Sequence, residues 1–411
     1  MDEAIEDADG RIDINSLKSR RLGTYTHTYT QRDAMLYALS LGCTAASGLR
    51  YVYEGAEDFA VLPTYSIVAA HPSLQLVPLE SYLPGGFDRA AALHGEHFLE
   101  LLGPPLPPGG GRLVTRPQLV DMQAKGNGLV VVLRTVTIDA DSGHDLAINE
   151  FTTFILGKGG IRTPWTPAPR SPAAVAANNP PNRTPDASAS FTTSPDQAAL
   201  YRLSGDYNPL HIDPRVSSRV GFPQPILHGL CTLGVSVRLV LRLMGGDDPR
   251  RLRSVKVRFS KHVLPRETLR VEMWVEQPLT GTHQQQQQQN QQQRQQQRGQ
   301  KEQQVEGVGG RGDAAGSTTS PGGASAAPTS GSGSIKVIFR TWVVERNVLA
   351  ISNAAVELLP PFISTNTTTM TTTTTRMSAE EVLLPPQPSV AAKAAVAAVA
   401  AKAAVAPVAR L

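Results

Sequence analysis

A carboxylate and an imidazole lie five residues apart in the stretch Tyr201-Arg-Leu-Ser-Gly-Asp-Tyr-Asn-Pro-Leu-His211. The dipeptide Asn208-Pro209 between them predicts a turn, which would let Asp206 and His211 point the same way. We expect Asn208 to hydrogen-bond one of the two side chains and fix its orientation. Such a pair can hold one water molecule and act as general base and general acid, each role contributing on the order of 10²–10⁴-fold to a rate. An enzyme that adds water across a double bond needs both roles, and an Asp–His pair can fill them.

A second signal follows at His228-Gly229, where a helix is predicted to begin. Apolar residues recur at helical spacing from Ile226 to Met244, and Gly245-Gly246 ends the pattern. Backbone N–H groups in the first turn of a helix lack intrahelical partners, and a glycine there lets a ligand approach closely. The Gly229 N–H is thus a candidate donor to a thioester oxygen that gains negative charge, a contact typically worth about 10²–10³ in rate.

Each of these features has a structural alternative when it is taken alone. Asp206 and His211 could form a turn network without chemistry, and His228 could be a hydrogen-bonded histidine of the core. The joint occurrence of the acid, the Asn-Pro turn, the imidazole and the His-Gly helix start favours the catalytic interpretation.

Composition excludes several classes of protein. The formal net charge of +4 over 411 residues is too small and too scattered to indicate nucleic-acid binding. Two distant cysteines, Cys43 and Cys231, indicate a reducing compartment without a disulfide framework. The acidic N-terminus argues against a secretory or transit peptide, and no run of 18 apolar residues predicts a membrane span.

An internal repeat organises the chain. Leu36-Tyr-Ala-Leu-Ser40 matches Leu200-Tyr-Arg-Leu-Ser204, and several predicted strands follow each copy. No acid or imidazole follows the first copy as in the second, so we expect chemistry in one repeat and scaffold in the other. The expected regions are a flexible lead-in (1–24), the N-terminal repeat (25–158), a proline-rich linker (159–188), the C-terminal repeat (189–360) and a disordered tail (361–411).

An insertion, residues 279–334, interrupts the second repeat. It contains glutamine runs followed by Gly/Ser/Ala/Pro sequence, which cannot bury enough apolar surface to order itself. Strand-like sequence flanks it, at 269–276 and 335–342. We therefore predict a β-hairpin with an expanded, disordered loop, which costs only about 0.6 kcal/mol per doubling of loop length.

The chain resembles enoyl-CoA hydratase type 2, the (R)-specific, MaoC-like family that also forms one domain of a peroxisomal multifunctional enzyme. The stretch from Tyr201 to His211, continued by Pro225-Ile-Leu-His-Gly-Leu-Cys231, resembles the family signature. Further segments resemble the family in the expected order: Tyr53-Glu-Gly55, Leu62-Pro-Thr64, Leu93-His-Gly-Glu96, Lys125-Gly-Asn-Gly128 and Ile351-Ser-Asn-Ala354.

This resemblance implies an α+β double hot-dog fold, in which two long helices are each wrapped by an antiparallel β-sheet. It implies reversible hydration of trans-2-enoyl-CoA to (3R)-3-hydroxyacyl-CoA in peroxisomal β-oxidation, with no metal and no redox cofactor. Asp206 and His211 would be the catalytic pair, Asn208 their support and Gly229 the oxyanion donor. The implied substrate contacts are His94, Gly95, Lys125, Tyr207, Pro209, Leu210 and Phe259. The first repeat would leave space for the acyl tail.

Some of these residues have other interpretations. Lys125 suits a CoA phosphate, and it equally suits an exposed hairpin turn. Glu54 is an additional acid in the empty repeat, where a structural role is the simpler interpretation. Lys256 and Arg258, on the strand face opposite Phe259, could meet CoA phosphates or simply face solvent.

The resemblance also implies a homodimer. The C-terminal Ala409-Arg410-Leu411 resembles the Ser-Lys-Leu address read by the peroxisomal import receptor, which predicts a peroxisomal location. No dehydrogenase-like sequence precedes the hydratase region and no sterol-carrier-like sequence follows it, so we expect a stand-alone hydratase. The alternatives are a hot-dog thioesterase, a 3-hydroxyacyl-carrier-protein dehydratase, or a non-enzymatic acyl-CoA-binding protein.

Overall fold

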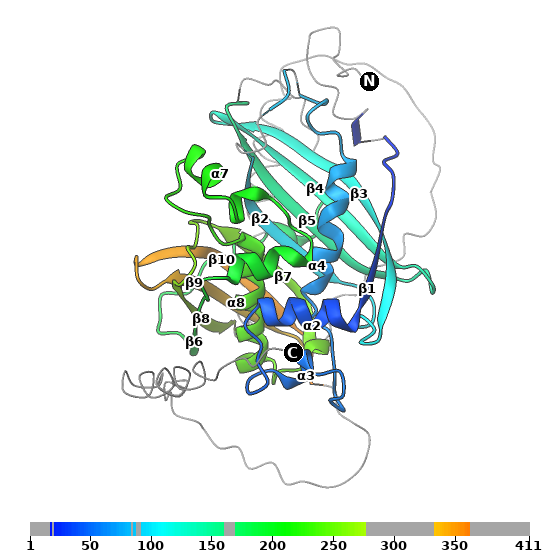
Figure 1. Ribbon diagram of the computed structural model, residues 1–411, viewed down its shortest axis with the longest axis vertical. Coiled ribbons are helices and arrows are strands. Elements are labelled where there is room, and N and C mark those ends of the chain that lie inside the picture. The colour runs from blue at the N-terminus through cyan, green and yellow to red at the C-terminus, as the bar shows by residue number, and fades with distance from the viewer. Residues whose placement is uncertain are drawn as a thin grey trace, which may run out of the picture. The chain divides into compact units, whose positions relative to one another are not determined.

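One antiparallel sheet of ten strands dominates the computed structural model, which describes residues 17–18, 20–83, 85–87, 92–159, 169–276 and 333–361 (Figure 1). All of these residues lie in one unit, Met1–Asn366. The strands are β1 (Tyr25–Thr30), β2 (Ala92–Leu101), β3 (Gly110–Lys125), β4 (Gly128–Asp139), β5 (Asp145–Leu156), β6 (Ala187–Thr192), β7 (Leu252–Phe259), β8 (Thr268–Glu276), β9 (Ile335–Val343) and β10 (Val348–Leu358).

Short helical segments connect these strands. The α-helices are α2 (Gln31–Ser40), α3 (Leu49–Val52), α4 (Tyr65–Ala70), α5 (Pro172–Val175), α6 (Gln197–Tyr201), α7 (Pro214–Arg219) and α8 (Gly229–Met244). The 3₁₀ helices are η1 (His71–Leu76), η3 (Arg202–Ser204), η4 (Pro209–His211) and η5 (Pro249–Arg251). Within the described ranges, every helix is too short or too polar to span a membrane.

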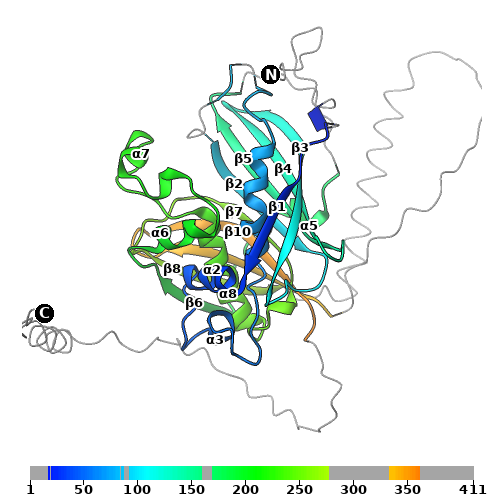
Figure 2. The same ribbon diagram turned by 45° about the vertical axis from the view of Figure 1, so that its right-hand side comes forward.

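The two halves of the chain repeat one strand order. The first half runs β1-β3-β4-β5-β2 and the second runs β6-β8-β9-β10-β7. Strands β2 and β7 pair with each other and join the halves, and Figure 2 shows β2, β7 and β10 between the outer strands. The helices that carry the matching Leu-Tyr-x-Leu-Ser segments also meet, because the buried rings of Tyr37 and Tyr201 lie 6.1 Å apart. The predicted duplication and the double hot-dog architecture are confirmed.

The central helix of the second repeat is α8. It contacts strands β6 to β10, and its residues from Leu230 to Leu241 are all buried. This burial follows from the near-continuous apolar sequence. The Ser236 hydroxyl, also buried, shares a hydrogen bond of 2.8 Å with Thr341 Oγ1 and so satisfies a polar group in the core. The predicted long helix is confirmed here.

The first repeat departs from the expectation of a long helix. Its counterpart of α8 is the six-residue α4, which contacts β1, β4 and β5 and continues as the 3₁₀ helix η1. Pro72 stands at the second position of η1 and has no backbone N–H to donate to the carbonyl four residues before it. The α-helical ladder therefore stops at Ala70, and the chain tightens into a 3₁₀ turn.

The predicted hairpin around the insertion is confirmed. Strands β8 and β9 pair in antiparallel register up to Glu276 opposite Lys336. The equivalent hairpin of the first repeat, β3–β4, closes directly at Lys125 opposite Gly128. Residues 277–332, nearly all of the insertion, lie outside the described residues. So do most of the lead-in, residues 160–168 of the linker and residues 362–411 of the tail.

Replacement of residues 279–334 by a short glycine-rich turn is expected to preserve the fold. The β8–β9 pairing already brings the two ends together, and each halving of a flexible loop lowers its closure cost by about 0.6 kcal/mol. Guanidinium-induced unfolding should give a free energy equal to or above that of the full chain. A shortened protein that is clearly less stable would show that the insertion packs on the sheet.

Candidate active site

A tight turn between η3 and η4 positions Asp206 and His211. Gly205 ends η3 with φ +133°, in a region that favours glycine, and Asp206 follows it. The Asn208 side chain accepts a hydrogen bond from Leu210 N at 3.0 Å and so caps η4, while Asn208 N donates to Asp206 Oδ1 at 3.2 Å. The Asn-Pro turn thus places the carboxylate at one end of the segment and His211 at the other.

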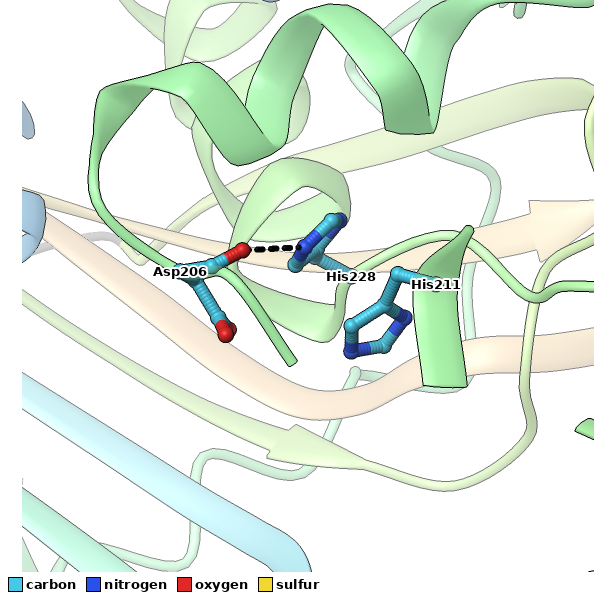
Figure 3. Close-up of side chains that lie close together, drawn as sticks. All are labelled: Asp206, His211 and His228. Atoms are coloured by element: carbon cyan, nitrogen blue, oxygen red, sulfur yellow. Dashed lines mark hydrogen bonds between the residues drawn. The ribbon is translucent and has the colours of Figure 1, made fainter. Parts of the chain in front are cut away.

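The tautomer of His211 follows from its hydrogen bond. Nδ1 lies 2.8 Å from the carbonyl oxygen of Ile226, which can only accept, so Nδ1 carries the proton. Nε2 is therefore left with a lone pair, and Figure 3 shows that edge of the ring facing the Asp206 carboxylate. The ligand-type atoms of the two residues lie within 4.8 Å of each other. This separation suits one water molecule that bonds to both.

His228 binds the two ends of this turn together. Its ring stacks on the His211 ring with centroids 3.7 Å apart and an interplanar angle of 28°. Its Nε2 donates to the backbone carbonyl oxygen of Asp206 at 3.2 Å (Figure 3). The side chain is 1% exposed, and burial, followed by the charge of His211, lowers the pKa of His228 to about 3. His228 is therefore a neutral support that belongs both to the core and to the site.

Electrostatics favour an ionised carboxylate beside neutral imidazoles. Burial acts to raise the pKa of the Asp206 carboxyl, but the positive charge of His71 acts to lower it. Protonation of His228 or His211 would add to that effect, and the pKa of the Asp206 carboxyl lies below its ordinary value. Burial lowers the pKa of His211 in spite of the opposing charge of Asp206. At neutral pH, both members of the pair are thus proton acceptors.

Gly229 is the first residue of α8, where backbone N–H groups have no intrahelical acceptor. A Cβ on Gly229 would lie 3.3 Å from the Phe259 ring, so the ring covers this helix start closely. The Phe259 ring in turn lies 5.0 Å from the ring of His94. The structure therefore brings two of the predicted substrate contacts, His94 and Phe259, beside the predicted oxyanion donor.

A β-bulge at Gly95 determines where His94 points. In the β2–β5 pairing, His94 lies opposite Thr153 and Glu96 opposite Thr152, which leaves Gly95 as an extra residue. The extra residue places His94 on the same face as His97, although residues three apart in a regular strand face opposite sides. The two histidine rings accordingly lie 5.5 Å apart.

The other predicted contacts lie in more exposed positions. Tyr207 is 58% exposed, and the Arg202 guanidinium lies 4.8 Å from its ring centroid. Pro209 is exposed and Leu210 is half-buried in η4, while Lys125 is exposed at the β3–β4 turn. Their roles as substrate contacts stay predictions.

His71, the first residue of η1, was not predicted as a site residue from the sequence. Its ring lies 5.9 Å from Phe151, whose ring also lies near His94 and His97. The first repeat lacks the Asp-Asn-Pro-His pattern, so no local signal connected His71 with Asp206. Glu54, the additional acid considered from the sequence, is exposed.

Asp206, His211 and His228 form the one group of potential metal ligands found among the described residues. The Nε2 of His228 carries the proton that it donates to the Asp206 carbonyl, so Nδ1, which is buried without a hydrogen-bond partner, is the nitrogen of this ring that has a free lone pair.

The buried neutral state of His228 predicts an acid-sensitive fold. The pKa of His228 in the folded protein is about 3, below the value of about 6.5 for an unfolded chain. Between these values the unfolded chain binds the extra proton, so stability is complete above about pH 6.5 and falls as the pH drops, by up to about 1.4 kcal/mol per pH unit for this one group. In chemical unfolding at several pH values, the free energy of unfolding of His228→Gln should fall less steeply with decreasing pH than that of the wild type. An equally steep fall would show that His228 is not the group that takes up the proton on unfolding.

Comparisons with known proteins match both repeats. The family described as MFE-2 hydratase 2 N-terminal domain matches residues 27–157, and the family described as MaoC like domain matches residues 176–298. Peroxisomal multifunctional enzyme type 2 of Mus musculus is 43% identical over 260 residues, which cover 62% of this chain and 34% of the mouse protein. The chain thus spans about a third of the length of that relative.

A shorter relative matches over nearly its whole length. Probable enoyl-CoA hydratase 2 of Dictyostelium discoideum is 40% identical over 272 residues, which cover 66% of this chain and 89% of the relative. Among solved structures, a MaoC-like dehydratase from Phytophthora capsici has a TM-score of 0.61 and 29% identity, covering 85% of this chain and all of that one. The full-length multifunctional enzyme type 2 of Drosophila melanogaster has a TM-score of 0.57 and 34% identity, covering 82% of this chain and 48% of that one. The chain belongs to the MaoC-like enoyl-CoA hydratase 2 family.

Proposed function

We propose that the chain hydrates trans-2-enoyl-CoA to (3R)-3-hydroxyacyl-CoA and catalyses the reverse dehydration. The observation that carries the proposal is the pairing of an ionised Asp206 with a neutral His211, whose polar atoms lie within 4.8 Å next to the start of α8. Membership of the enoyl-CoA hydratase 2 family supports it, as does the position of Gly229 beside Phe259 and His94.

The protonation states determine the order of proton transfers. A water molecule bonded to Asp206 and to Nε2 of His211 gives a proton to the pair as its oxygen attacks C3 of the enoyl group. The electron pair of the double bond moves toward the thioester oxygen, where the Gly229 N–H stabilises the developing charge. The enolate then takes at C2 the proton that the pair received. One water molecule is consumed, and Asp206 and His211 return to their starting states.

The acid and the base can be tested separately. Asp206→Asn and His211→Gln should each lower kcat/KM by on the order of 10²–10⁴-fold, because each removes one proton acceptor. The assay follows loss of the conjugated double bond of crotonyl-CoA and decenoyl-CoA and assigns the chirality of the product.

Asp213→Asn is the matched control. Asp213 lies in the same segment, but its carboxylate caps α7 and pairs with the exposed Arg215 at 2.9 Å. Full activity in Asp206→Asn, or an (S) product, would overturn the proposal. Release of free CoA without a hydroxyacyl product would point to a thioesterase instead.

We propose an acyl-CoA thioester as substrate, with neither a metal nor a redox cofactor, and a peroxisomal location. The substrate contacts would be His94, Gly95, Lys125, Tyr207, Pro209, Leu210 and Phe259. The location is supported by relatives that are named peroxisomal. The chain would act as a homodimer and reach the organelle through the import receptor for Ala409-Arg410-Leu411, which lie outside the described residues.

Removal of the last three residues tests the location. A fluorescent protein fused to the N-terminus of the full chain should colocalise with a peroxisomal marker, and the version that lacks Ala409-Arg410-Leu411 should stay diffuse. Hydratase activity of the purified truncated protein should equal that of the full chain. Peroxisomal import without the tripeptide would show that another signal directs the protein.

A further inference from the structure

The first repeat places an imidazole beside the catalytic turn of the second. A Cβ on Gly205 would lie 3.4 Å from the carbonyl oxygen of Val68 and 3.8 Å from Cγ of Pro72. The segment from Val68 to Pro72 therefore packs against the residue that precedes Asp206. His71 lies within that segment, at the start of η1.

The His71 ring also belongs to a row of neighbouring rings that leads to the predicted oxyanion donor. It lies 5.9 Å from the Phe151 ring, which lies 5.7 Å from His94. His94 contacts Phe259, and Phe259 covers Gly229. His71 is thus connected by direct ring contacts to the start of α8 as well as by backbone packing to Asp206.

The charges that act on Asp206 come from both repeats. Its ionisable neighbours are His71 on η1, His94 on β2, Tyr201 on α6, His211 on η4 and His228 at the start of α8. Burial keeps His94 and His228 neutral, since it lowers their pKa values to about 4 and about 3. Among the groups that lower the pKa of the Asp206 carboxyl, His71 has the largest effect.

We propose that His71 is a positioning residue for Asp206: the packing of Val68–Pro72 against Gly205 brings the imidazole of the first repeat beside the buried carboxylate, where it stabilises the ionised form. The inference rests on the proposed function, in which Asp206 must be ionised to bond the water molecule. It assigns an electrostatic role in the reaction to the repeat that lacks the catalytic pair.

Replacement of the imidazole by a neutral side chain tests the proposal. In His71→Gln the pKa of Asp206 should rise, and so should the pKa of His211, which His71 also lowers. The acid limb of the kcat/KM profile should therefore move to higher pH. We expect a loss of about three- to tenfold on the acid side of the limb, which corresponds to a pKa shift of about 0.5–1 unit, and little change near pH 8. His71→Lys restores a positive charge and should return the acid limb to the wild-type position. The pH at the midpoint of the acid limb is measured for each variant from its own profile, so it does not depend on the fraction of protein that is active.

His97→Gln is the matched control from the same cluster. Burial has the largest effect in lowering the pKa of His97, and the charges of His94 and His71 lower it further. The Nε2 of His97 forms a hydrogen bond of 3.2 Å with the side chain of Asn149. The glutamine amide can keep that bond, so the acid limb should stay in place. An unchanged acid limb in His71→Gln would overturn the proposal. An equal shift in His71→Lys would do the same, because it would show that shape and not charge matters.

A readout without turnover separates this inference from the proposed function. The carboxyl ¹³C signal of Asp206, assigned by its loss in Asp206→Asn, can be titrated in the free protein. Its titration should move to higher pH in His71→Gln whether or not the chain hydrates enoyl-CoA. Absence of hydration in the wild type with this shift present would overturn the function alone. Normal hydration with no shift would overturn the role of His71 alone.

Discussion

The pairing of β2 with β7 is the constraint on which the site depends. Five residue pairs join the two repeats into one sheet, and each strand would otherwise expose a row of unpaired backbone groups. The same pairing brings His94 of β2 against Phe259 at the end of β7, and Phe259 covers Gly229. Groups far apart in the chain therefore meet because two strand edges satisfy each other, and the site belongs to the junction and not to one repeat.

A buried carboxylate at this junction must be stabilised in its charged form. Burial alone would raise the pKa of Asp206 and leave it a weak base. The imidazole of His71 acts most strongly against this cost, followed by those of His228 and His211. His228 supports the turn through a hydrogen bond to the backbone carbonyl of Asp206, and its low pKa keeps it from becoming an ion in the core. Neutral rings can then stack at 3.7 Å, a distance at which two cations would repel.

Local patterns were sufficient to predict the parts of the site that local structure builds. The Asn208-Pro209 turn and the apolar period of α8 predicted the placement of Asp206, His211 and Gly229, because each depends on a few neighbouring residues. The short α4 follows from Pro72, which cannot continue the α-helical hydrogen bonds, although the symmetry of the repeats predicts a longer helix. His71 could not be predicted, since its closeness to Asp206 arises only when η1 packs against Gly205.

The bulge at Gly95 shows why the direction in which His94 points cannot be predicted from the alternation of residues along β2. Alternation along a regular β2 would place His94 and His97 on opposite faces, so that only one could reach Phe151. The extra residue reverses the alternation at one point and leaves Glu96 on the other face, 3.4 Å from Lys256. A glycine in a strand predicts that a bulge can occur, but not which neighbour it turns inward. That choice is made by the register of β5 against β2, and it decides whether the first repeat contributes an imidazole to the site.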